Sequence, residues 1–469
     1  MIGKKLIIYE LNEVPFRIFN YFSNQNYSAF NFLSKYARKY ETLAEDVGHL
    51  SPWITWPSLH RGVSNEQHEI SDFGMDLSKV NKEYPPLWEI LSKKNKIGVF
   101  GSLHTYPLPN NLENYKFFVP DTFAAGKQCF PKKYEVFQDF NLTMASINAR
   151  NVEKVIALKK AKNFLLSSPS LGLSGSTILK VIKQLFDEKI KPERVVRRRT
   201  TQVQLAFDFY FKALKENKPD ISFFFTNHVA SSMHRYWPGL FPEDYKISKF
   251  SKEWKKTWKN EIPFTIYEAN DQIQKLINFV NKNKSYSLVV LSSMGQAAVD
   301  GSEMVDNEII IEKLDKLMQF LGIEKNAWEK RPAMVPQYIV KIKDQNNRIK
   351  FLKNMSLLKI NNKNLKTKHM GENIFKIEIG INNQKGLEIY FNQIKKNPED
   401  CGLKLISLQD AAGANAYHIP EGILLVYDPL DYKINKETLD KISTLNITPS
   451  ILKNFSYSIP SYMTDGYNL

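Results

Sequence analysis

The chain has little cysteine, no long apolar run and no evident internal repeat. Its only two cysteines, Cys129 and Cys401, are far apart, which argues against a disulfide framework and favours a reducing, cytoplasmic setting. No stretch of about 18 apolar residues occurs, so we expect no membrane span. The first apolar run, Leu6 to Tyr9, is too short for the apolar region of a signal peptide.

The sequence also lacks any nucleic-acid-binding motif, although its formal net charge is +16 and its pI is near 9.3. The one concentrated basic run, from Arg194 to Arg199, holds four arginines in addition to two valines. We interpret this run as a solvated helix face. A nucleic-acid partner is unlikely from the sequence, and an anionic membrane surface, acidic glycan or phosphate group fits the charge better than a duplex.

What the chain does contain is enough apolar sequence for a large folded core. Hydrophobic residues make up 43% and aromatic residues 13% of the chain, as in globular proteins. Strand-like apolar runs alternate with segments of helical periodicity. The runs are Lys4 to Tyr9, Ile97 to Gly101, Ile221 to Phe225, Ser287 to Leu291 and Ile423 to Val426, and the helical segments include 16–40 and 267–281. This alternation predicts an α/β fold, with a mostly parallel sheet and helices on both faces.

Two stretches differ in sequence pattern from the rest of the predicted α/β domain. The segment 120–215 is long, mostly helical in pattern and basic, which predicts a helical insertion or cap. Between 335 and 400, runs with a period of two, such as 338–342 and 374–379, are separated by turns rich in Asn, Gln and Lys. This pattern predicts a small antiparallel β insertion. We therefore expect one α/β domain over 1–469 with two insertions.

The candidate catalytic and metal-binding residues lie in segments that include, follow or adjoin these strands. These segments are Leu6 to Asn12; Ser51 to Val63, with His68 beyond; Asn227 to Trp237; Leu291 to Gly295; and His418 to Gly422. In this order, they resemble the alkaline phosphatase superfamily, in particular its type I phosphodiesterase and nucleotide pyrophosphatase-like branch. The resemblance covers about residues 4 to 110 and 220 to 465, and implies an alkaline phosphatase-like fold.

The resemblance further implies two divalent metals, usually zinc, held by aspartates and histidines around a phosphoester. The metal-site positions of this chain are Asn12, Asn227, His234, Ser293 and His418, and Met294 stands where the family has a further histidine ligand. Only the two histidines match the family pattern directly. An amide oxygen is a neutral, weaker ligand, so we expect at most one weakly bound divalent metal, zinc or manganese, or none. Glu10 or His228 is a further possible ligand for such a single metal.

The resemblance leaves the nucleophile open between Ser51 and Thr55, and it gives His228 as a third catalytic candidate. Five of the eight histidines fall in segments that the family folds around one cleft: His49, His60, His228, His234 and His418. His104 is expected to line the same cleft. Histidines without carboxylates can bind an anion or transfer protons without a metal.

Two functions remain open at this point. The first is a phosphoester-processing enzyme, either a phosphodiesterase- or phosphatase-like hydrolase or a phosphoryl-group transferase, with a metal-poor site and a small anionic substrate. The second is a catalytically silent relative that binds a phosphorylated or sulfated glycan, a nucleotide or a partner protein. Fold alone does not choose between them.

Overall fold

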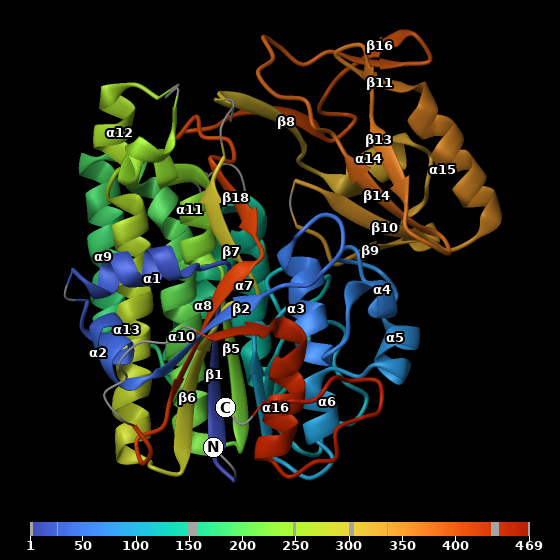
Figure 1. Cartoon of the computed structure of the whole chain (residues 1–469). Helices are drawn as coiled ribbons and strands as arrows, with labels where there is room; N and C mark the ends of the chain where they lie inside the picture. Colours follow the sequence, from blue (N-terminus) through green and yellow to red (C-terminus); the bar gives the residue numbers. More distant parts are fainter. Residues whose placement is uncertain are drawn as a thin grey trace.

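A computed structural model of the chain describes residues 3–25, 27–148, 158–246, 250–299, 304–334, 336–432 and 440–467 (Figure 1). Its centre is a sheet of eight strands in the order β20-β2-β19-β6-β1-β5-β3-β4. The strands are β1 (Lys5–Leu11), β2 (Arg38–Leu43), β3 (Ile97–Phe100), β4 (Tyr115–Val119), β5 (Ile221–Thr226), β6 (Tyr286–Leu291), β19 (Glu421–Tyr427) and β20 (Asp440–Ser443). Among these strands, β19 alone runs antiparallel to its neighbours. The predicted mixed α/β architecture with a mostly parallel sheet is confirmed.

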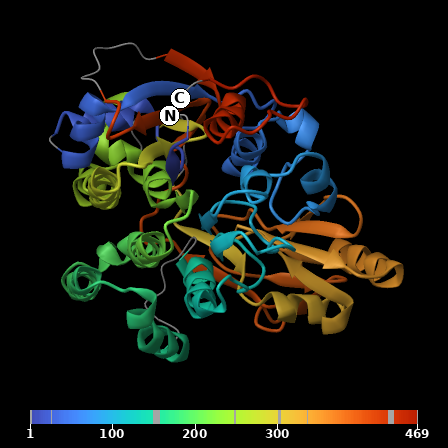
Figure 2. The same ribbon diagram turned by 90° about the horizontal axis from the view of Figure 1, so that it is seen from below.

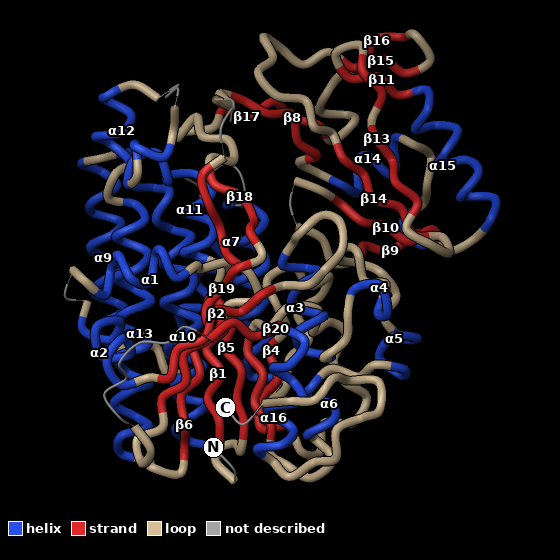
Figure 3. Tube along the Cα trace, viewed as in Figure 1, coloured by secondary structure: helices blue, strands red, loops and turns tan. Residues whose placement is uncertain are grey.

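Helices cover both faces of this sheet (Figure 3). The helices of the described residues are α1 (Phe16–Ser23), α2 (Ser28–Tyr36), α3 (Pro52–Arg61), α4 (Asn65–His68), α5 (Ser78–Glu83), α6 (Leu87–Leu91), α7 (Glu135–Asn148), α8 (Leu158–Leu171), α9 (Gly175–Ile190), α10 (Arg198–Asn217), α11 (His228–Leu240), α12 (Lys252–Trp258), α13 (Glu261–Lys282), α14 (Leu314–Phe320), α15 (Gln345–Leu357) and α16 (Ile447–Asn454), of which α14 and α15 lie in a smaller lobe and not on this sheet. Short 3-10 turns lie at 132–134, 192–197, 242–244, 325–327 and 444–446. No helix in the described part of the chain is both long and apolar enough to cross a membrane.

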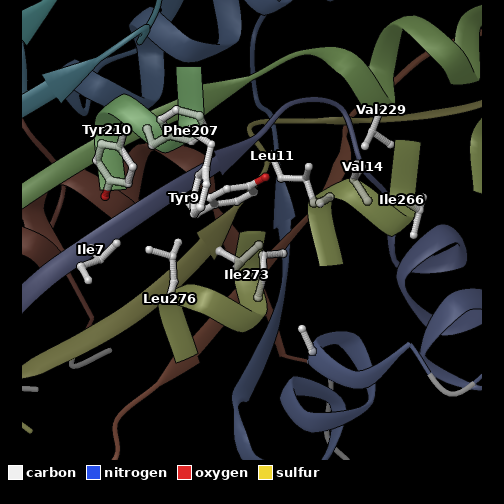
Figure 4. Close-up of a cluster of buried hydrophobic side chains, with 14 of the residues drawn as sticks. Ile7, Tyr9, Leu11, Val14, Phe207, Tyr210, Val229, Ile266, Ile273 and Leu276 are labelled. Atoms are coloured by element: carbon white, nitrogen blue, oxygen red, sulfur yellow. The ribbon is translucent and has the colours of Figure 1, made fainter. Parts of the chain in front are cut away.

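The central strand β1 shows why its sequence is apolar almost throughout. Ile7, Tyr9 and Leu11 face one helical layer, whereas Leu6 and Ile8 belong to the core on the opposite face. Figure 4 shows the first set packed against side chains of α10 and α13, among them Phe207, Tyr210, Ile273 and Leu276. A strand buried on both faces loses the polar alternation of a half-exposed strand.

A smaller lobe follows β6 in the chain and lies beyond the carboxyl ends of the parallel strands (Figure 1). Its strands are β8 (Asn307–Ile311), β9 (Trp328–Arg331), β10 (Tyr338–Ile342), β11 (Leu358–Ile360), β12 (Lys363–Asn364), β13 (Lys366–His369), β14 (Ile374–Glu378), β15 (Ile389–Phe391), β16 (Ile394–Lys396) and β17 (Leu403–Ser407). They pair in two four-stranded antiparallel sheets and one two-stranded sheet. The lobe also contains α14 and α15, around a hydrophobic cluster of its own.

Two local expectations differ from the structure. The helical pattern expected over 16–40 is interrupted after α1, and α2 ends at Tyr36. Tyr40 instead lies in β2, because the chain pairs there with the antiparallel β19. The position of His418 just before the strand-like run Ile423 to Val426 predicts a loop at the edge of the sheet. In the structure, His418 instead lies in the short strand β18 (Ala416–Ile419), which pairs with β7 (Gly295–Ala298).

The packing of α13 on β1 gives a stability prediction. Ile273 is fully buried in this core, so Ile273→Ala should lower the free energy of unfolding by about 2–5 kcal/mol through lost burial and a residual cavity. Ile349 on α15 is 56% exposed, and Ile349→Ala should change it by less than about 0.5 kcal/mol. Urea unfolding followed by tryptophan fluorescence measures both variants. Equal effects would contradict the packing described here.

Candidate functional site

The carboxylate of Glu13 lies at the centre of the candidate site. Glu13 follows β1 directly, at the carboxyl end of the strand, and its φ of 60° is in the left-handed region that non-glycine residues seldom adopt. This turn directs a buried carboxylate toward two histidines from distant segments. His234 Nε2 lies 2.9 Å and His418 Nε2 lies 3.4 Å from Glu13 Oε2. The side-chain amides of Asn12 and Gln296 also donate to this carboxylate.

Backbone carbonyls fix the orientation of both imidazole rings. His234 Nδ1 lies 2.7 Å from the carbonyl oxygen of Ala416, and His418 Nδ1 lies 2.7 Å from that of Leu50. A carbonyl oxygen only accepts, so each Nδ1 carries a hydrogen and each Nε2 faces Glu13. This is the arrangement in which Nε2 either bears a second proton or binds a metal.

The electrostatics of the cluster favour bound positive charge. Burial disfavours the Glu13 carboxylate, but the adjacent His234 and His418 outweigh it and hold the pKa of Glu13 far below its ordinary value. Burial alone would lower the pKa of His418, yet its contact with Glu13 raises that pKa above the ordinary imidazole value. The site therefore stabilises protons on nitrogen, or a cation in their place.

The donor set fits one divalent metal. Ligand atoms of Glu13, His234 and His418 all lie within 4.8 Å of one another, and one carboxylate with two neutral imidazoles is a set that suits zinc and leaves further positions open. The ring centroids of the two histidines are 5.2 Å apart. The structure thus brings His234 and His418 together, and their role as ligands of one metal stays a prediction.

The residues expected at the other metal-site positions are already engaged with protein groups. Asn12 Nδ2 donates to Asn227 Oδ1 at 2.7 Å, and Asn12 Oδ1 accepts from Trp56 Nε1 at 2.7 Å. The Ser293 hydroxyl lies 2.8 Å from that of Thr55, and Met294 is fully buried. These neutral, mutually satisfied groups offer no negative charge to a second dication, so a dinuclear site does not fit.

The two candidate nucleophiles differ in their surroundings. Ser51 is the N-cap of α3, and its buried hydroxyl has no hydrogen-bond partner among the described groups. The Thr55 hydroxyl, one turn further, is paired with Ser293. Neither residue is among the described residues that line the cleft, although Pro52 and Trp53 are. Both hydroxyls thus lie just behind the cleft wall.

The remaining candidates are bonded to groups other than Glu13, although His228 lines the same cleft. His228 is buried between the Thr226 hydroxyl and the carbonyl oxygen of Thr265, and burial lowers its pKa to about 4. Glu10 pairs with His60 Nε2 at 2.6 Å on the α3 side of the sheet. Neither Glu10 nor His228 joins His234 and His418 around the possible metal position.

The other two histidines named from the sequence make separate contacts. His104 Nε2 lies 2.9 Å from the Trp53 carbonyl oxygen, and burial lowers the pKa of His104 to about 3. His49 is exposed, and its Nε2 lies 3.2 Å from the hydroxyl of Tyr417, the neighbour of His418. Of the two, only His49 is close to the Glu13 cluster, which it approaches from the solvent side.

The cluster opens into a cleft of about 560 Å³ between the α/β body and the smaller lobe. Side chains of α7 and α10 form one wall, and residues around β8 and β14 form another. Two arginines, Arg199 and Arg235, line the same cleft. Arg235 Nη1 lies 2.9 Å from Asp410 Oδ2, and burial lowers the pKa of Arg199 to about 10, which leaves its guanidinium charged at neutral pH.

The arginine run is not the solvated face expected from the sequence. Arg194 pairs with Asp187, Arg197 with Glu261 and Arg198 with Glu188, at 2.9, 2.7 and 2.7 Å. These pairs fasten the 3-10 turn at 192–197 and the start of α10 to α9 and α13. Arg199 alone of the four lines the cleft.

Sequence reasoning missed Glu13 and Arg235, and it named Arg199 only as one of the four arginines of the basic run. Glu13 directly follows a buried strand, which is a usable signal for a ligand at the carboxyl edge of a parallel sheet. It was overlooked because the resemblance placed the metal ligand one residue earlier, at Asn12. Arg235 follows a candidate histidine in the sequence, but its approach to Arg199 depends on the packing of α10 beside α11.

Comparison with known proteins gives structural neighbours only. No family model and no curated protein matches the sequence. Murine ectonucleotide pyrophosphatase/phosphodiesterase 5 matches with 11% identity and a TM-score of 0.41, over 99% of this chain and 98% of the other. An inactive form of that protein in complex with AMP has the same identity and TM-score, over 99% and 97%. The human counterpart matches at 9% and 0.37, over 99% and 97%.

These neighbours are phosphodiesterases of the branch that the sequence resembles. At TM-scores of 0.37 to 0.41 the likeness carries no argument about activity. The chemistry proposed below therefore rests on the residues of this cleft.

The contact between Glu13 and His418 predicts a pH dependence in metal-free protein. Glu13→Gln removes the anion that holds a proton on His418, so the pKa of His418 should fall, as followed by NMR titration of the imidazole. Glu372→Gln, on the surface of the lobe, should leave that pKa unchanged.

The direction in which stability changes with pH follows from the pKa shifts of His418 and Glu13. The raised pKa of His418 stabilises the fold below the ordinary imidazole value of about 6.5, and this contribution is lost as pH rises through the folded-state pKa. The lowered pKa of Glu13 stabilises the fold above its ordinary value of 4.5, and this contribution is lost as pH falls toward the folded-state pKa. An unchanged His418 pKa in Glu13→Gln would contradict the contact.

Proposed function

We propose that the protein is a phosphoester-processing enzyme, a hydrolase or phosphoryl-group transferase, whose site holds one divalent metal in place of a pair. The observation that carries this proposal is the convergence of Glu13, His234 and His418 on one point of a cleft that also presents two arginines. A phosphoryl group carries negative charge on its oxygens. A bound metal and nearby arginines would both stabilise that charge.

The residues that would hold the metal are Glu13, His234 and His418. When bound, such a metal supplies Lewis-acid polarisation of a phosphoryl oxygen and lowers the pKa of a bound water. Glu13 contributes the single negative charge of the set, and the carbonyls of Ala416 and Leu50 keep both Nε2 atoms pointed at it. Without metal, the contact with Glu13 raises the pKa of His418, which favours a proton at Nε2 that a leaving oxygen could accept.

Arg199 and Arg235 are suited to orient the anionic substrate. A guanidinium binds phosphate oxygens in a fixed, bidentate geometry. Arg235 is held by Asp410, whose carboxylate also accepts from the Tyr236 hydroxyl at 2.8 Å. Arg199 interacts with the same Asp410 and Tyr236, so both arginines are held beside one carboxylate, and we assign anion binding to the pair.

The nucleophile remains a choice between Ser51, Thr55 and water. Both hydroxyls are fully buried behind Pro52 and Trp53, and this observation favours a second candidate function. In that alternative, the protein is a catalytically silent relative whose cleft binds a phosphorylated or sulfated glycan, a nucleotide or a partner protein. His228, enclosed by Thr226 and Thr265, is better placed to support the fold than to transfer protons.

Metal content and turnover distinguish these functions. We expect at most one zinc or manganese per chain by inductively coupled plasma mass spectrometry, and loss of that metal in Glu13→Gln and His234→Ala. Glu372→Gln is the matched control. Because a proton on His418 Nε2 competes with the metal, and the pKa of His418 is raised by Glu13, metal affinity should fall as pH drops through that raised pKa.

The same samples should be assayed with a chromogenic aryl phosphodiester, with and without chelator. Turnover that depends on the single metal supports the enzyme. No turnover at any metal loading, with ligand binding retained, supports the silent relative. Two tightly bound metals per chain would contradict the conclusion that Asn12, Asn227 and Ser293 hold no second metal.

The role of Arg199 gives a separate prediction. Arg199→Gln should weaken binding of AMP, used as a nucleotide probe, by about tenfold or more because one charged hydrogen-bonding group is lost. Arg194→Gln, which removes a partly exposed pair outside the cleft, should leave the affinity within about twofold. Isothermal titration calorimetry measures both, with circular dichroism to show that each variant is folded. Equal affinities for Arg199→Gln and the parent chain would remove Arg199 from the site.

A further inference from the structure

Helix α9 is amphipathic, but its apolar face points outward, whereas a normal surface helix turns its apolar face to the core. Its outward face carries six large apolar side chains, between 40% and 68% exposed. These are Ile178, Leu179, Ile182, Leu185, Phe186 and Ile190. At about 100° per residue they form one continuous stripe over roughly 140° of the helix circumference. The only buried residues of α9 are polar, Thr177 and Gln184.

Polar contacts hold this helix in place with its apolar stripe outward. Lys180 Nζ lies 2.8 Å from Glu268 and 3.0 Å from Asp271 on α13. At the other end of α9, Asp187 pairs with Arg194 and Glu188 with Arg198. The orientation is therefore specified by ion pairs on the inner face. Figure 2 shows the helices of residues 158–190 at the outer edge of the molecule, beyond α10.

A continuous apolar stripe of this kind marks a surface that is covered by something else. Leu166 on α8, the helix before α9 in the chain, is a further exposed apolar residue, at 74%. Elsewhere, the described exposed apolar residues occur singly, such as Ile394, or in pairs close in sequence, such as Ile349 and Leu352 on α15.

The charges around the stripe indicate what covers it. Lys189 lies within the stripe near its C-terminal end, Lys183 lies at its border, and Lys191 follows the helix; all three are exposed. Lysine stems can lie along an apolar surface while their ammonium groups reach anionic headgroups. Within the described part of α9, both acidic residues are paired on the inner face.

A basic groove on the neighbouring helices extends this positive surface. Lys212 of α10 donates to the Ser170 carbonyl oxygen of α8 at 2.7 Å. Lys215 follows about one turn later and lines a groove together with Lys218 and with Lys275 and Lys282 of α13. Lys275 of this groove is paired with Asp271, and the other lysines add to the positive charge that anionic lipids attract.

We infer that α9 is a docking surface for an anionic lipid bilayer, with the apolar stripe inserted among the headgroups and the lysines at the phosphate level. A second copy of the chain is a poorer occupant. A two-fold contact places the same patch on both subunits, so the exposed lysines of two positively charged patches would be brought into one interface. The inference is independent of the chemistry proposed for the cleft.

Vesicle binding by the full-length protein tests this surface. Sedimentation with vesicles of equal parts phosphatidylglycerol and phosphatidylcholine should carry the protein down, whereas phosphatidylcholine alone should bind it far more weakly. Leu179→Gln/Phe186→Gln should weaken binding to the anionic vesicles by at least about tenfold, since two inserted apolar side chains are lost. Lys183→Gln/Lys189→Gln should also weaken it and reduce its salt dependence.

The matched control is Ile349→Gln/Ile394→Gln, which changes two exposed isoleucines in the lobe and should bind vesicles like the parent chain. Thermal unfolding confirms that each variant is folded. Failure of the parent chain to bind anionic vesicles, or equal binding to neutral ones, would overturn the assignment. It would also be overturned if analytical ultracentrifugation showed a dimer that the stripe variant dissociates, since a second copy would then cover α9.

Discussion

The contact between one carboxylate and two imidazoles determines how the cleft of this protein is organised. Glu13 comes from the end of the central strand, His234 from the helix after β5, and His418 from a short strand near the end of the chain. Each histidine is also fixed by a backbone carbonyl. A buried carboxylate without these partners would be costly. The cluster therefore joins three distant segments and makes the site selective for positive charge.

The same cluster explains why neutral side chains are acceptable elsewhere in the site. Asn12 and Asn227 bond to each other, and Trp56 donates to Asn12. Carboxylates at these two positions, 2.7 Å apart, would repel one another unless a cation lay between them. Amides remove that requirement. The fold at the edge of the sheet can thus form without a second metal, while Glu13 retains charge for a single cation.

The sequence predicted the sheet well because its strands are buried on both faces and read as uninterrupted apolar runs, as at 221–225 and 287–291. It failed where a partner strand overrides local pattern, as at Tyr40, which pairs with β19. In the site, His234 and His418 were predictable from segment order. Glu13 was missed because its direction depends on a left-handed backbone turn. Arg199 could not be distinguished from the other arginines of its run, because its burial depends on how α10 packs against the cleft.

Helix α10 connects the two surfaces on which the proposals depend. Its first turns carry Arg199 and Gln202 into the cleft wall, whereas Lys212, further along, contacts the end of α8. The ion pair between Arg198 and Glu188 ties the start of the same helix to α9. The orientation of α9 at a lipid surface would therefore fix α10, and with it one wall of the cleft, relative to that surface. The polar inner face of α9 gives this connection a defined geometry, because ion pairs specify direction more narrowly than apolar contact does.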